Sequence, residues 1–219
     1  MHRNSSNLPD EVIDKIKEIE LDYIEENLSK LLGRMRGGAN RISKIVKSLQ
    51  VFSSLDTAKV ISVDIHVIMD SILLIIQPRL QNPLFQIQVI QDYGELPLVN
   101  CFPNALKQAI MNIINHAIHA LEIKFYQNKY GVEQPTISIR TEKLENDWLG
   151  IYISDNGLGI TEENCSKIFD PFFTTKPVSQ GKGLGLSISY QIIVEQHEGR
   201  IKCISSPEKG AEFVIEIPI

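Results

Sequence analysis

The stretch DNGLGI, residues 155–160, directly follows an alternating strand-like segment, and GKGLGLS, residues 181–187, directly precedes an apolar helix-like segment. Glycine is favoured where a turn needs positive φ or where the backbone must pass close to another group. In the second stretch, glycines and a helix N-terminus bring backbone N–H groups together, as in an anion site, and Lys182 adds a positive charge. Neither stretch has the spacing of a Walker loop or of a dinucleotide fingerprint.

Residues 168–180, IFDPFFTTKPVSQ, lie between the two glycine stretches and hold three aromatic residues and two prolines in a polar, loop-like context. Two interpretations are open. The aromatic side chains anchor the ends of a mobile lid whose Thr174, Thr175 and Lys176 face phosphates, or they form an ordinary hydrophobic plug.

The periodicity of the remaining chain predicts an α+β fold. Helices are expected at about 65–80, capped by Asp64, at 103–124, opened by Pro103, and after GKGLGLS. Alternation of apolar and polar residues predicts five strands: FQIQVI (85–90), TISIR (136–140), LGIYIS (149–154), RIKCIS (200–205) and EFVIEIP (212–218). Because the elements come in runs rather than strict alternation, we expect a two-layer α/β sandwich, with a mixed or antiparallel sheet and helices on one face.

Residues 10–55 carry an apolar stripe with a seven-residue repeat on an otherwise charged helix. Such a seam is typical of a coiled coil or helical bundle, and a kink is expected at Gly37–Gly38. The sequence therefore predicts a long helix over 1–57, followed by a second domain over 58–219. Self-association through the stripe is preferred to packing against the chain's own domain.

Composition excludes several classes of protein. The net charge of −5 and the absence of a long basic block argue against nucleic acid as the main partner. Three unclustered cysteines favour a disulfide-free chain from a reducing compartment. The longest apolar run, SILLIIQP, is far below the roughly 18 residues of a membrane span. A soluble, cytoplasmic chain without leader or membrane contact is expected.

The order of five motifs resembles the catalytic, ATP-binding domain of sensor histidine kinases. They are NxxxHA in a helix, DNGLGI, FDPFFTTK, GKGLGLS and GAEFVIEIP, and the resemblance covers about residues 60–219. This domain belongs to a superfamily that includes type II topoisomerases, mismatch-repair ATPases and a heat-shock chaperone. The N-terminal stripe resembles the second helix of the family's dimerisation and phosphotransfer hairpin.

The resemblance implies ATP held between a helix and a lid. Asp155 would accept a hydrogen bond from the adenine amino group, while Gly157 and Gly159 let the chain pass close to the base. Asn112 is the candidate catalytic and metal-binding residue. The remaining implied contacts are the lid residues Phe169, Phe172, Phe173, Thr174, Thr175 and Lys176, and the phosphate-binding residues Lys182, Gly183, Leu184, Gly185 and Leu186.

One departure from the family pattern concerns magnesium. The family's Mg²⁺ ligand is an asparagine four residues after Asn112, and His116 stands there. Mg²⁺ prefers oxygen ligands, whereas a neutral imidazole suits Zn, Cu or Ni. Asn115 points about 100° away on a helix and does not substitute. Three interpretations are open: a tolerated substitution, a transition-metal site with His119, or a protonated His116 that binds phosphate.

A second departure is that none of the five histidines has the setting of the family's phosphate acceptor. Autophosphorylation within this chain is therefore not expected. The preferred function is transfer of the ATP γ-phosphate to a histidine elsewhere, for relay to a response-regulator receiver domain, with homodimerisation through the N-terminal helix of the full-length protein. The alternatives are a degenerate nucleotide-binding module that serves regulation or assembly, an ATPase of a related branch, and a plain helical dimerisation fragment.

Overall fold

The protein is described by a computed structural model over residues 27–28, 30–39, 59–127, 133–175 and 183–219. The chain divides into two compact units, Met1–Ser53 and Ser54–Ile219. In the first unit, residues 27–28 and 30–39 are helical, and the large apolar side chains among them are 51–64% exposed. The rest of the predicted apolar stripe lies outside the described residues, so dimerisation through it stays a prediction.

The second unit is built on a five-stranded mixed sheet in the order β4-β6-β7-β9-β8. The strands are β4 (Gln88–Tyr93), β6 (Thr136–Leu144), β7 (Trp148–Asp155), β8 (Arg200–Ser205) and β9 (Ala211–Pro218). The pair β4–β6 is parallel, and the other three pairs are antiparallel. The predicted mixed sheet is therefore confirmed, and β7 lies at its centre.

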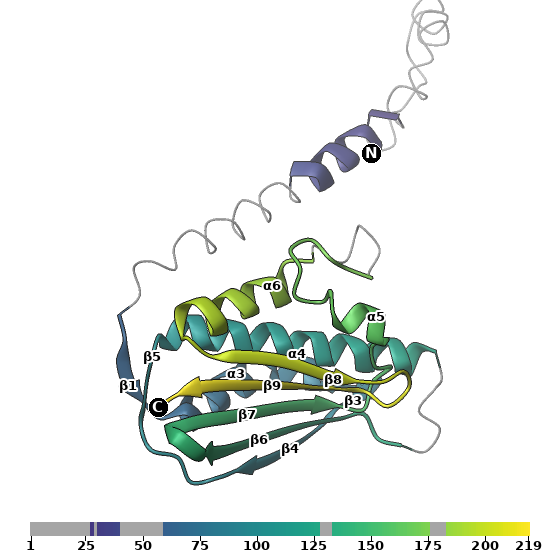
Figure 1. Ribbon diagram of the computed structural model, residues 1–219. Coiled ribbons are helices and arrows are strands. Elements are labelled where there is room, and N and C mark those ends of the chain that lie inside the picture. The colour runs from purple at the N-terminus through teal and green to yellow at the C-terminus, as the bar shows by residue number, and fades with distance from the viewer. Residues whose placement is uncertain (1–26, 29, 40–58, 128–132, 176–182) are drawn as a thin grey trace, which may run out of the picture. The chain divides into compact units, whose positions relative to one another are not determined.

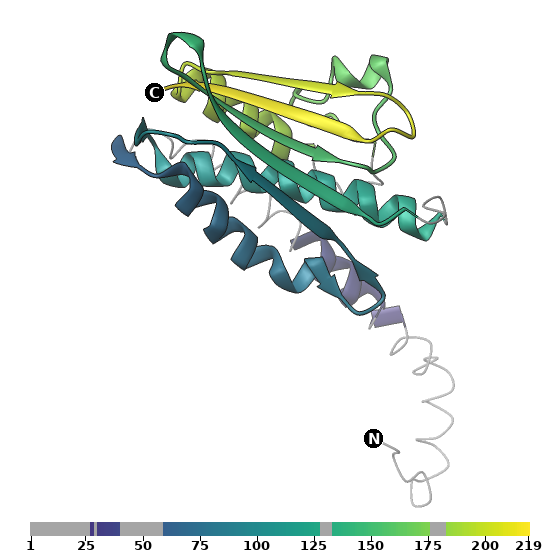
Figure 2. The same cartoon turned by 90° about the horizontal axis from the view of Figure 1, so that it is seen from below.

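The helices cover one face of this sheet, as predicted (Figures 1 and 2). They are α3 (Ile65–Leu80), α4 (Pro103–Tyr126) and α6 (Gly185–Tyr190), which continues as a π-helical segment, η3 (Gln191–Gln196). The short helix α5 (Glu162–Cys165) lies between β7 and α6 in the chain. Among the described residues, no helix is both long and apolar enough to cross a membrane.

Local sequence explains where the two longest helices begin. The side chain of Asp64 accepts a 2.8 Å hydrogen bond from the N–H of His66, which caps α3. Helix α4 begins at Pro103, whose missing N–H costs nothing in a first turn. Its cap residue, Phe102, makes no side-chain cap. Instead, the N–H of Phe102 donates to Nε2 of His197 at 3.1 Å.

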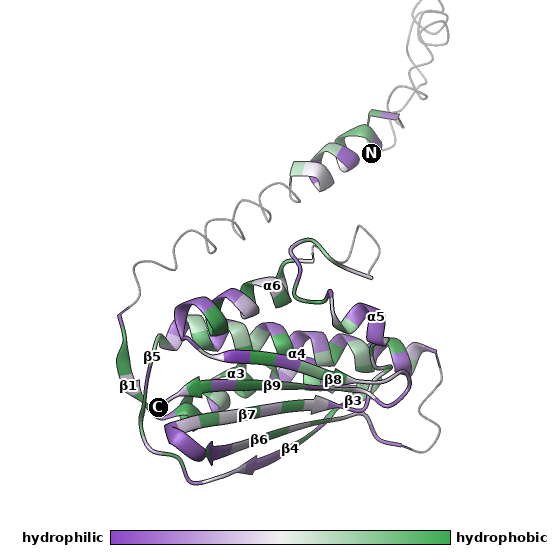
Figure 3. Ribbon diagram, in the orientation of Figure 1, coloured by the Kyte–Doolittle hydropathy of each residue, from purple (hydrophilic) through white to green (hydrophobic). Residues whose placement is uncertain are grey.

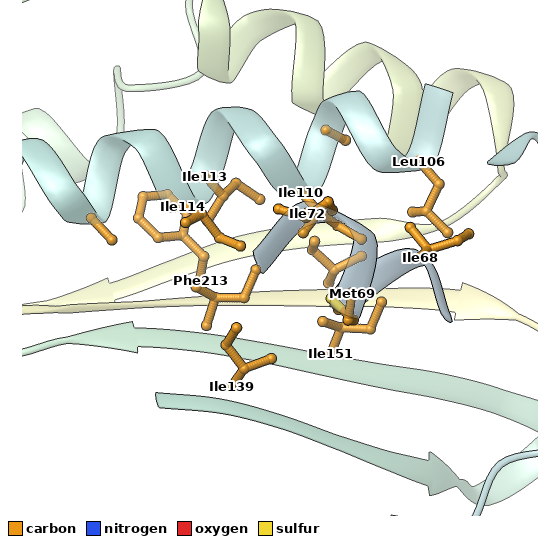
Figure 4. Packing of buried hydrophobic residues seen from close by; sticks show 14 of the residues in the cluster. Ile68, Met69, Ile72, Leu106, Ile110, Ile113, Ile114, Ile139, Ile151 and Phe213 are labelled. Atoms are coloured by element: carbon orange, nitrogen blue, oxygen red, sulfur yellow. The ribbon is translucent and has the colours of Figure 1, made fainter. Parts of the chain in front are cut away.

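The hydrophobic core lies between the helices and the sheet (Figure 3). Figure 4 shows Ile110, Ile113 and Ile114 of α4 above Phe213 and Ile139 of the sheet, and all five are fully buried. Their spacing of three, four and one residues places the isoleucines on one side of the helix. Asn112, two residues after Ile110, lies on the side of α4 away from these isoleucines, where it contacts Gly185 of α6.

The structure differs from the predicted strands in one place and adds two short pairs. FQIQVI is divided into β3 (Phe85–Gln86), which pairs with β2 (Gln81–Asn82), and β4. The division falls at Ile87, because its N–H donates to the carbonyl oxygen of Leu80, whereas the N–H of Gln88 donates to the carbonyl oxygen of Pro135. Strands β1 (Ile61–Val63) and β5 (Val99–Cys101) form a separate pair, and η2 (Glu145–Asp147) joins β6 to β7.

Candidate functional site

Asp155 is the last residue of β7 and is held by strands on both sides. It is paired with Ile137 of β6 and with Ala211 of β9. Only 7% of the residue is exposed, and its Oδ1 accepts a 2.8 Å hydrogen bond from the N–H of Gly157. Its Oδ2 is buried and meets no donor in good geometry among the described residues. The carboxylate therefore presents one acceptor for a ligand.

Burial raises the pKa of Asp155 from 3.8 to about 6. The N–H groups of Gly157 and Ala211 and the positive charge of Lys124 act in the opposite direction but do not cancel the burial. A buried carboxylate with a raised pKa is typical of a functional site.

The glycines of DNGLGI are required by close packing. A Cβ on Gly157 would lie 2.6 Å from Oδ1 of Asp155 and 2.8 Å from Cβ of Ala120. Gly159 has a φ of +72°, and a Cβ there would lie 2.0 Å from the carbonyl oxygen of Ser206. The stretch therefore passes between helix α4 and the β8–β9 turn, and only glycine fits at these two positions.

Asn112 and His116 lie on one face of α4, four residues apart, as predicted. The Nδ2 of Asn112 donates a 3.0 Å hydrogen bond to the carbonyl oxygen of Gly185, the first residue of α6. The structure thus brings the helix motif and the second glycine stretch together. With its amide nitrogen engaged, Asn112 has its side-chain oxygen as the atom suited to a cation.

His116 is half-buried and packs against the sheet. Its ring lies edge-on to Phe213 of β9, with centroids 5.5 Å apart, and its Nδ1 is shielded from solvent. Neighbouring Asn115 faces α3, where its side-chain oxygen accepts a 2.6 Å hydrogen bond from Arg79. Asn115 does not replace the missing amide at position 116, as the helix geometry predicted.

His119 does not join His116 in a cluster of metal ligands. Its Nδ1 lies 3.7 Å from Oε2 of Glu122, whose other oxygen accepts a 3.1 Å hydrogen bond from Arg79. Within the described part of the chain, no group of three or more His, Cys, Asp or Glu residues could hold a metal ion. The transition-metal interpretation of His116 and His119 therefore gains no support from the geometry.

The predicted lid begins with aromatic residues that differ in exposure. Phe169 packs against Phe213 and Tyr190, with ring centroids 6.4 Å and 5.8 Å away, and Phe173 also contacts the core. Phe172 has a φ of 67° and a 66% exposed side chain. Two of the three aromatics therefore anchor the segment, and the third points to solvent.

The lid segment meets the second glycine stretch through the backbone. The N–H of Phe172 donates to the carbonyl oxygen of Gly183 at 2.8 Å. Gly183 has a φ of +64°, and a Cβ there would lie within 2.6 Å of backbone atoms of Phe172 and Phe173. Thr174 and Thr175 are exposed at the end of the described segment. Lys176 and Lys182 lie outside the described residues, so their predicted roles are not tested.

The backbone N–H groups at the start of α6 are suited to bind an anion. Its cap residue, Leu184, provides no side-chain cap, so the first N–H groups of the helix are not satisfied by a side chain. A Cβ on Gly185 would meet nothing closer than 3.8 Å. Leu184 and Leu186 pack against the core, and Ser189 donates a 3.1 Å hydrogen bond to the carbonyl oxygen of Ala109 of α4. These contacts fix the helix start beside Asn112.

Three residues of the site were not singled out from the sequence. Ala120 contacts the DNGLGI turn, and Lys124 donates a 2.7 Å hydrogen bond to the carbonyl oxygen of Asn156. Gly210 has a φ of +83°, and a Cβ there would lie 1.8 Å from the carbonyl oxygen of Asp155. The motif GAEF in the sequence pointed to Gly210. Lys124 could not be recognised, because in the sequence it resembles any exposed lysine of an amphipathic helix.

The polar groups of the site suit an adenine nucleotide better than they suit Mg²⁺. The buried acceptor of Asp155 suits an amino group, and the uncapped start of α6 suits phosphate. On the face of α4 that carries Asn112 and His116, these two residues offer one amide oxygen and one imidazole as metal ligands, and Mg²⁺ prefers oxygen. Asn112 and His116 are thus a poor pair for this cation.

The family "Histidine kinase-, DNA gyrase B-, and HSP90-like ATPase" matches residues 102–219. The chain belongs to this family. Among solved structures, the catalytic domain of histidine kinase ThkA aligns with a TM-score of 0.60 and 28% identity, covering 73% of this chain and 95% of that one. The ATP-binding fold that the motifs implied is therefore confirmed.

Curated relatives are sensor kinases. Sporulation kinase E of Bacillus subtilis (strain 168) is 35% identical over 65% of this chain and 17% of its own length. The signal transduction histidine-protein kinase AtoS of Escherichia coli (strain K12) is 32% identical over 81% of this chain and 27% of its own length. This chain thus spans about a sixth to a quarter of the length of these two relatives.

Proposed function

We propose that this chain is the ATP-binding catalytic domain of a two-component sensor histidine kinase, which transfers the ATP γ-phosphate to a histidine outside this chain. The observation that carries the proposal is the buried Oδ2 of Asp155, which meets no hydrogen-bond donor among the described residues, beside the tightly packed Gly157 and Gly210. Every relative reported above is described as a kinase, which favours this function over a degenerate regulatory module.

The charged carboxylate of Asp155 would accept a hydrogen bond from the adenine amino group. Guanine has a carbonyl oxygen at the corresponding position, so the same carboxylate would repel it. The base would lie against the glycine turn, which packs so closely on α4 and on the β8–β9 turn that a side chain at Gly157 or Gly159 would displace it together with Asp155. Selectivity for ATP over GTP follows from this arrangement.

The triphosphate would extend toward the start of α6, where backbone N–H groups of the first turn are suited to anions. Asn112, hydrogen-bonded to Gly185, would fix the distance between α4 and these N–H groups. Phosphoryl transfer depends mainly on position and charge neutralisation rather than on covalent chemistry by the protein. The chain would therefore act by orienting the γ-phosphate toward a histidine supplied by another segment or protein.

His116 would weaken the magnesium site of this kinase. Because an imidazole is a poor ligand for Mg²⁺, the amide oxygen of Asn112 would be the cation's main side-chain ligand from α4. His116 would instead stabilise the fold through its contact with Phe213. Magnesium would then improve ATP binding less than in kinases with asparagine at both positions.

The partners proposed for the full-length protein follow from its relatives. A crystal structure of ThkA with its response regulator protein TrrA aligns with a TM-score of 0.63 and 25% identity. A response-regulator receiver domain is proposed as the final phosphate acceptor here. Homodimerisation is proposed from the apolar seven-residue repeat of residues 10–55, and a cytoplasmic location from the family.

Phosphate transfer to a separately supplied hairpin tests the kinase proposal. The chain is incubated with γ-labelled ATP, Mg²⁺ and the dimerisation hairpin of a related sensor kinase that contains the acceptor histidine. We expect acid-labile, alkali-stable label on the hairpin, and none when Asp155→Asn is used. ATP binding without any transfer to several such hairpins would instead support the regulatory module.

A further inference from the structure

Lys124 is a buried cation directly beneath the DNGLGI turn. It lies in the last turn of α4, and only 5% of the residue is exposed. Its Nζ donates a 2.7 Å hydrogen bond to the carbonyl oxygen of Asn156, the residue after Asp155. Burial of an ammonium group is costly unless opposite charge or acceptors surround it. A lysine at this place therefore requires an explanation beyond solubility.

The charges around Asp155 explain it. Lys124 supplies a positive charge that favours the ionised form of Asp155, with a smaller effect than the N–H groups of Gly157 and Ala211. A second carboxylate, that of Glu133, is exposed and has its Oε2 3.9 Å from Nζ. The N–H of Ala211, on the sheet, also favours the ionised carboxylate. Burial raises the pKa of the Cys203 thiol on β8, and the charge of Asp155 adds to this rise.

The turn itself does not depend on Lys124 alone. The side chain of Asn156 accepts a 2.8 Å hydrogen bond from the N–H of Thr136 and donates a 2.9 Å bond to the carbonyl oxygen of Gln134. These bonds attach the turn to the start of β6. A change at Lys124 would thus alter the charge beside Asp155 while the turn keeps its other attachments.

We propose that Lys124 is a positioning residue for adenine recognition, which holds the Asn156 carbonyl and keeps the Asp155 carboxylate charged so that it accepts the amino group of the base. This inference rests on the proposed ATP function and adds a residue that acts through Asp155. A lysine that only neutralised the end of helix α4 could be replaced without a change in ATP binding.

The test follows the Asp155 carboxyl by ¹³C NMR in the full chain, between pH 4 and pH 8. In Lys124→Met, we expect the midpoint to rise by about half a pH unit, because a positive charge lowers a carboxyl pKa and Lys124 acts on Asp155 less strongly than the N–H groups of Gly157 and Ala211 do. Lys124→Arg should restore it toward the wild-type value. Glu145→Gln, an exposed glutamate beyond the other end of β7, should leave it unchanged.

ATP titrations of the same variants connect the charge to binding. At pH 6.0, Lys124→Met should bind ATP about twofold more weakly than the wild type, with nearly equal affinity at pH 8, because the two forms differ mainly in the charged fraction of Asp155. Equal weakening at every pH, or a midpoint that coincides with the wild type, would overturn the proposal. If Lys124→Met does not fold, the uncharged Lys124→Gln replaces it, and a midpoint equal to that of the wild type overturns the proposal.

These outcomes separate this inference from the proposed function. ATP binding in the wild type with an unchanged Asp155 midpoint in Lys124→Met would contradict only the role of Lys124. No ATP binding by the wild type at any pH between 5 and 8 would contradict the proposed function, whatever the carboxyl titration shows.

Discussion

The ring of His116 lies edge-on against the ring of Phe213, with centroids 5.5 Å apart and planes at 71°. This contact joins the expected magnesium position on α4 to the central part of the sheet. Through this ring contact, His116 contributes to the packing of the core. Compared with an asparagine, it offers an aromatic contact in place of an amide oxygen that could bind a metal ion.

Replacement of His116 by asparagine should reverse that exchange. We expect His116→Asn to increase the improvement in ATP affinity on addition of Mg²⁺, because a second amide oxygen then faces the phosphates. The same variant should lose about 1 kcal/mol of stability with the aromatic contact. Calorimetric ATP titrations with Mg²⁺ and with EDTA measure the first effect, and thermal unfolding measures the second.

His119→Asn is the matched control, because His119 lies beside Glu122. Its response to Mg²⁺ should equal that of the wild type. An identical response in His116→Asn and the wild type would mean that position 116 does not determine magnesium use.

Asp155→Asn should abolish ATP binding and raise the stability of the free protein. The folded-state pKa of about 6 exceeds the usual 3.8, so the ionised, folded form carries a penalty of about 3 kcal/mol at pH 7. In the wild type, the contribution of this group to stability is full below pH 3.8 and is lost as pH rises through about 6. Denaturation across this range should show the loss in the wild type and not in the variant.

Asp92→Asn, at an exposed aspartate of the edge strand β4, should leave both ATP binding and this pH dependence unchanged. A stability of Asp155→Asn below that of the wild type at pH 7 would argue that the carboxylate is satisfied in the free protein.

His197 should give a pH dependence of the opposite sign. Burial lowers its pKa below 6.5, and its Nε2 accepts the N–H of Phe102 at the start of α4, which needs the neutral ring. The stability that it provides is full above pH 6.5 and is lost as pH falls through the lowered folded-state value. His197→Gln should be less stable than the wild type at pH 7.5 and should show a weaker loss on acidification.

Denaturant unfolding at a series of pH values measures this slope, with His119→Gln as the half-exposed control. An acid slope in His197→Gln as steep as in the wild type would assign the acid sensitivity to other groups.

Two glycines of the site should respond oppositely to alanine. Gly159→Ala should destabilise the fold by several kcal/mol, because φ is +72° and the new methyl group would lie 2.0 Å from a carbonyl oxygen. Gly185→Ala meets nothing closer than 3.8 Å and should leave stability equal or up to about 1 kcal/mol higher. Thermal unfolding of the two variants distinguishes a steric clash from a change in backbone flexibility. Equal losses of stability in the two variants would contradict the steric explanation.

The longest periodic segments could be predicted from the sequence because their burial repeats. Helix α3 was expected at about 65–80 and is found at Ile65–Leu80. The spacing in α4 also predicted that Asn112 and His116 share a face and that Asn115 does not. The mixed sheet and the helices on one face followed from the order of these elements.

Features that depend on distant partners could not be read from the sequence. The division of FQIQVI at Ile87 arises because neighbouring N–H groups donate to Leu80 and Pro135, which lie far apart in the chain. Lys124 has no motif of its own, and its role appears only when α4 and the turn after β7 are seen together. Phe172 was expected to hold the lid, yet its backbone conformation turns the side chain to solvent.

The central claim is that Asp155 and its glycine turn recognise the adenine of ATP, and calorimetric titration of the full chain at pH 7.5 tests it most directly. The wild type should bind ATP at one site in the presence of Mg²⁺ and show no comparable affinity for GTP, and Asp155→Asn should bind neither. Equal binding of ATP and GTP, or ATP binding that survives Asp155→Asn, would contradict the account.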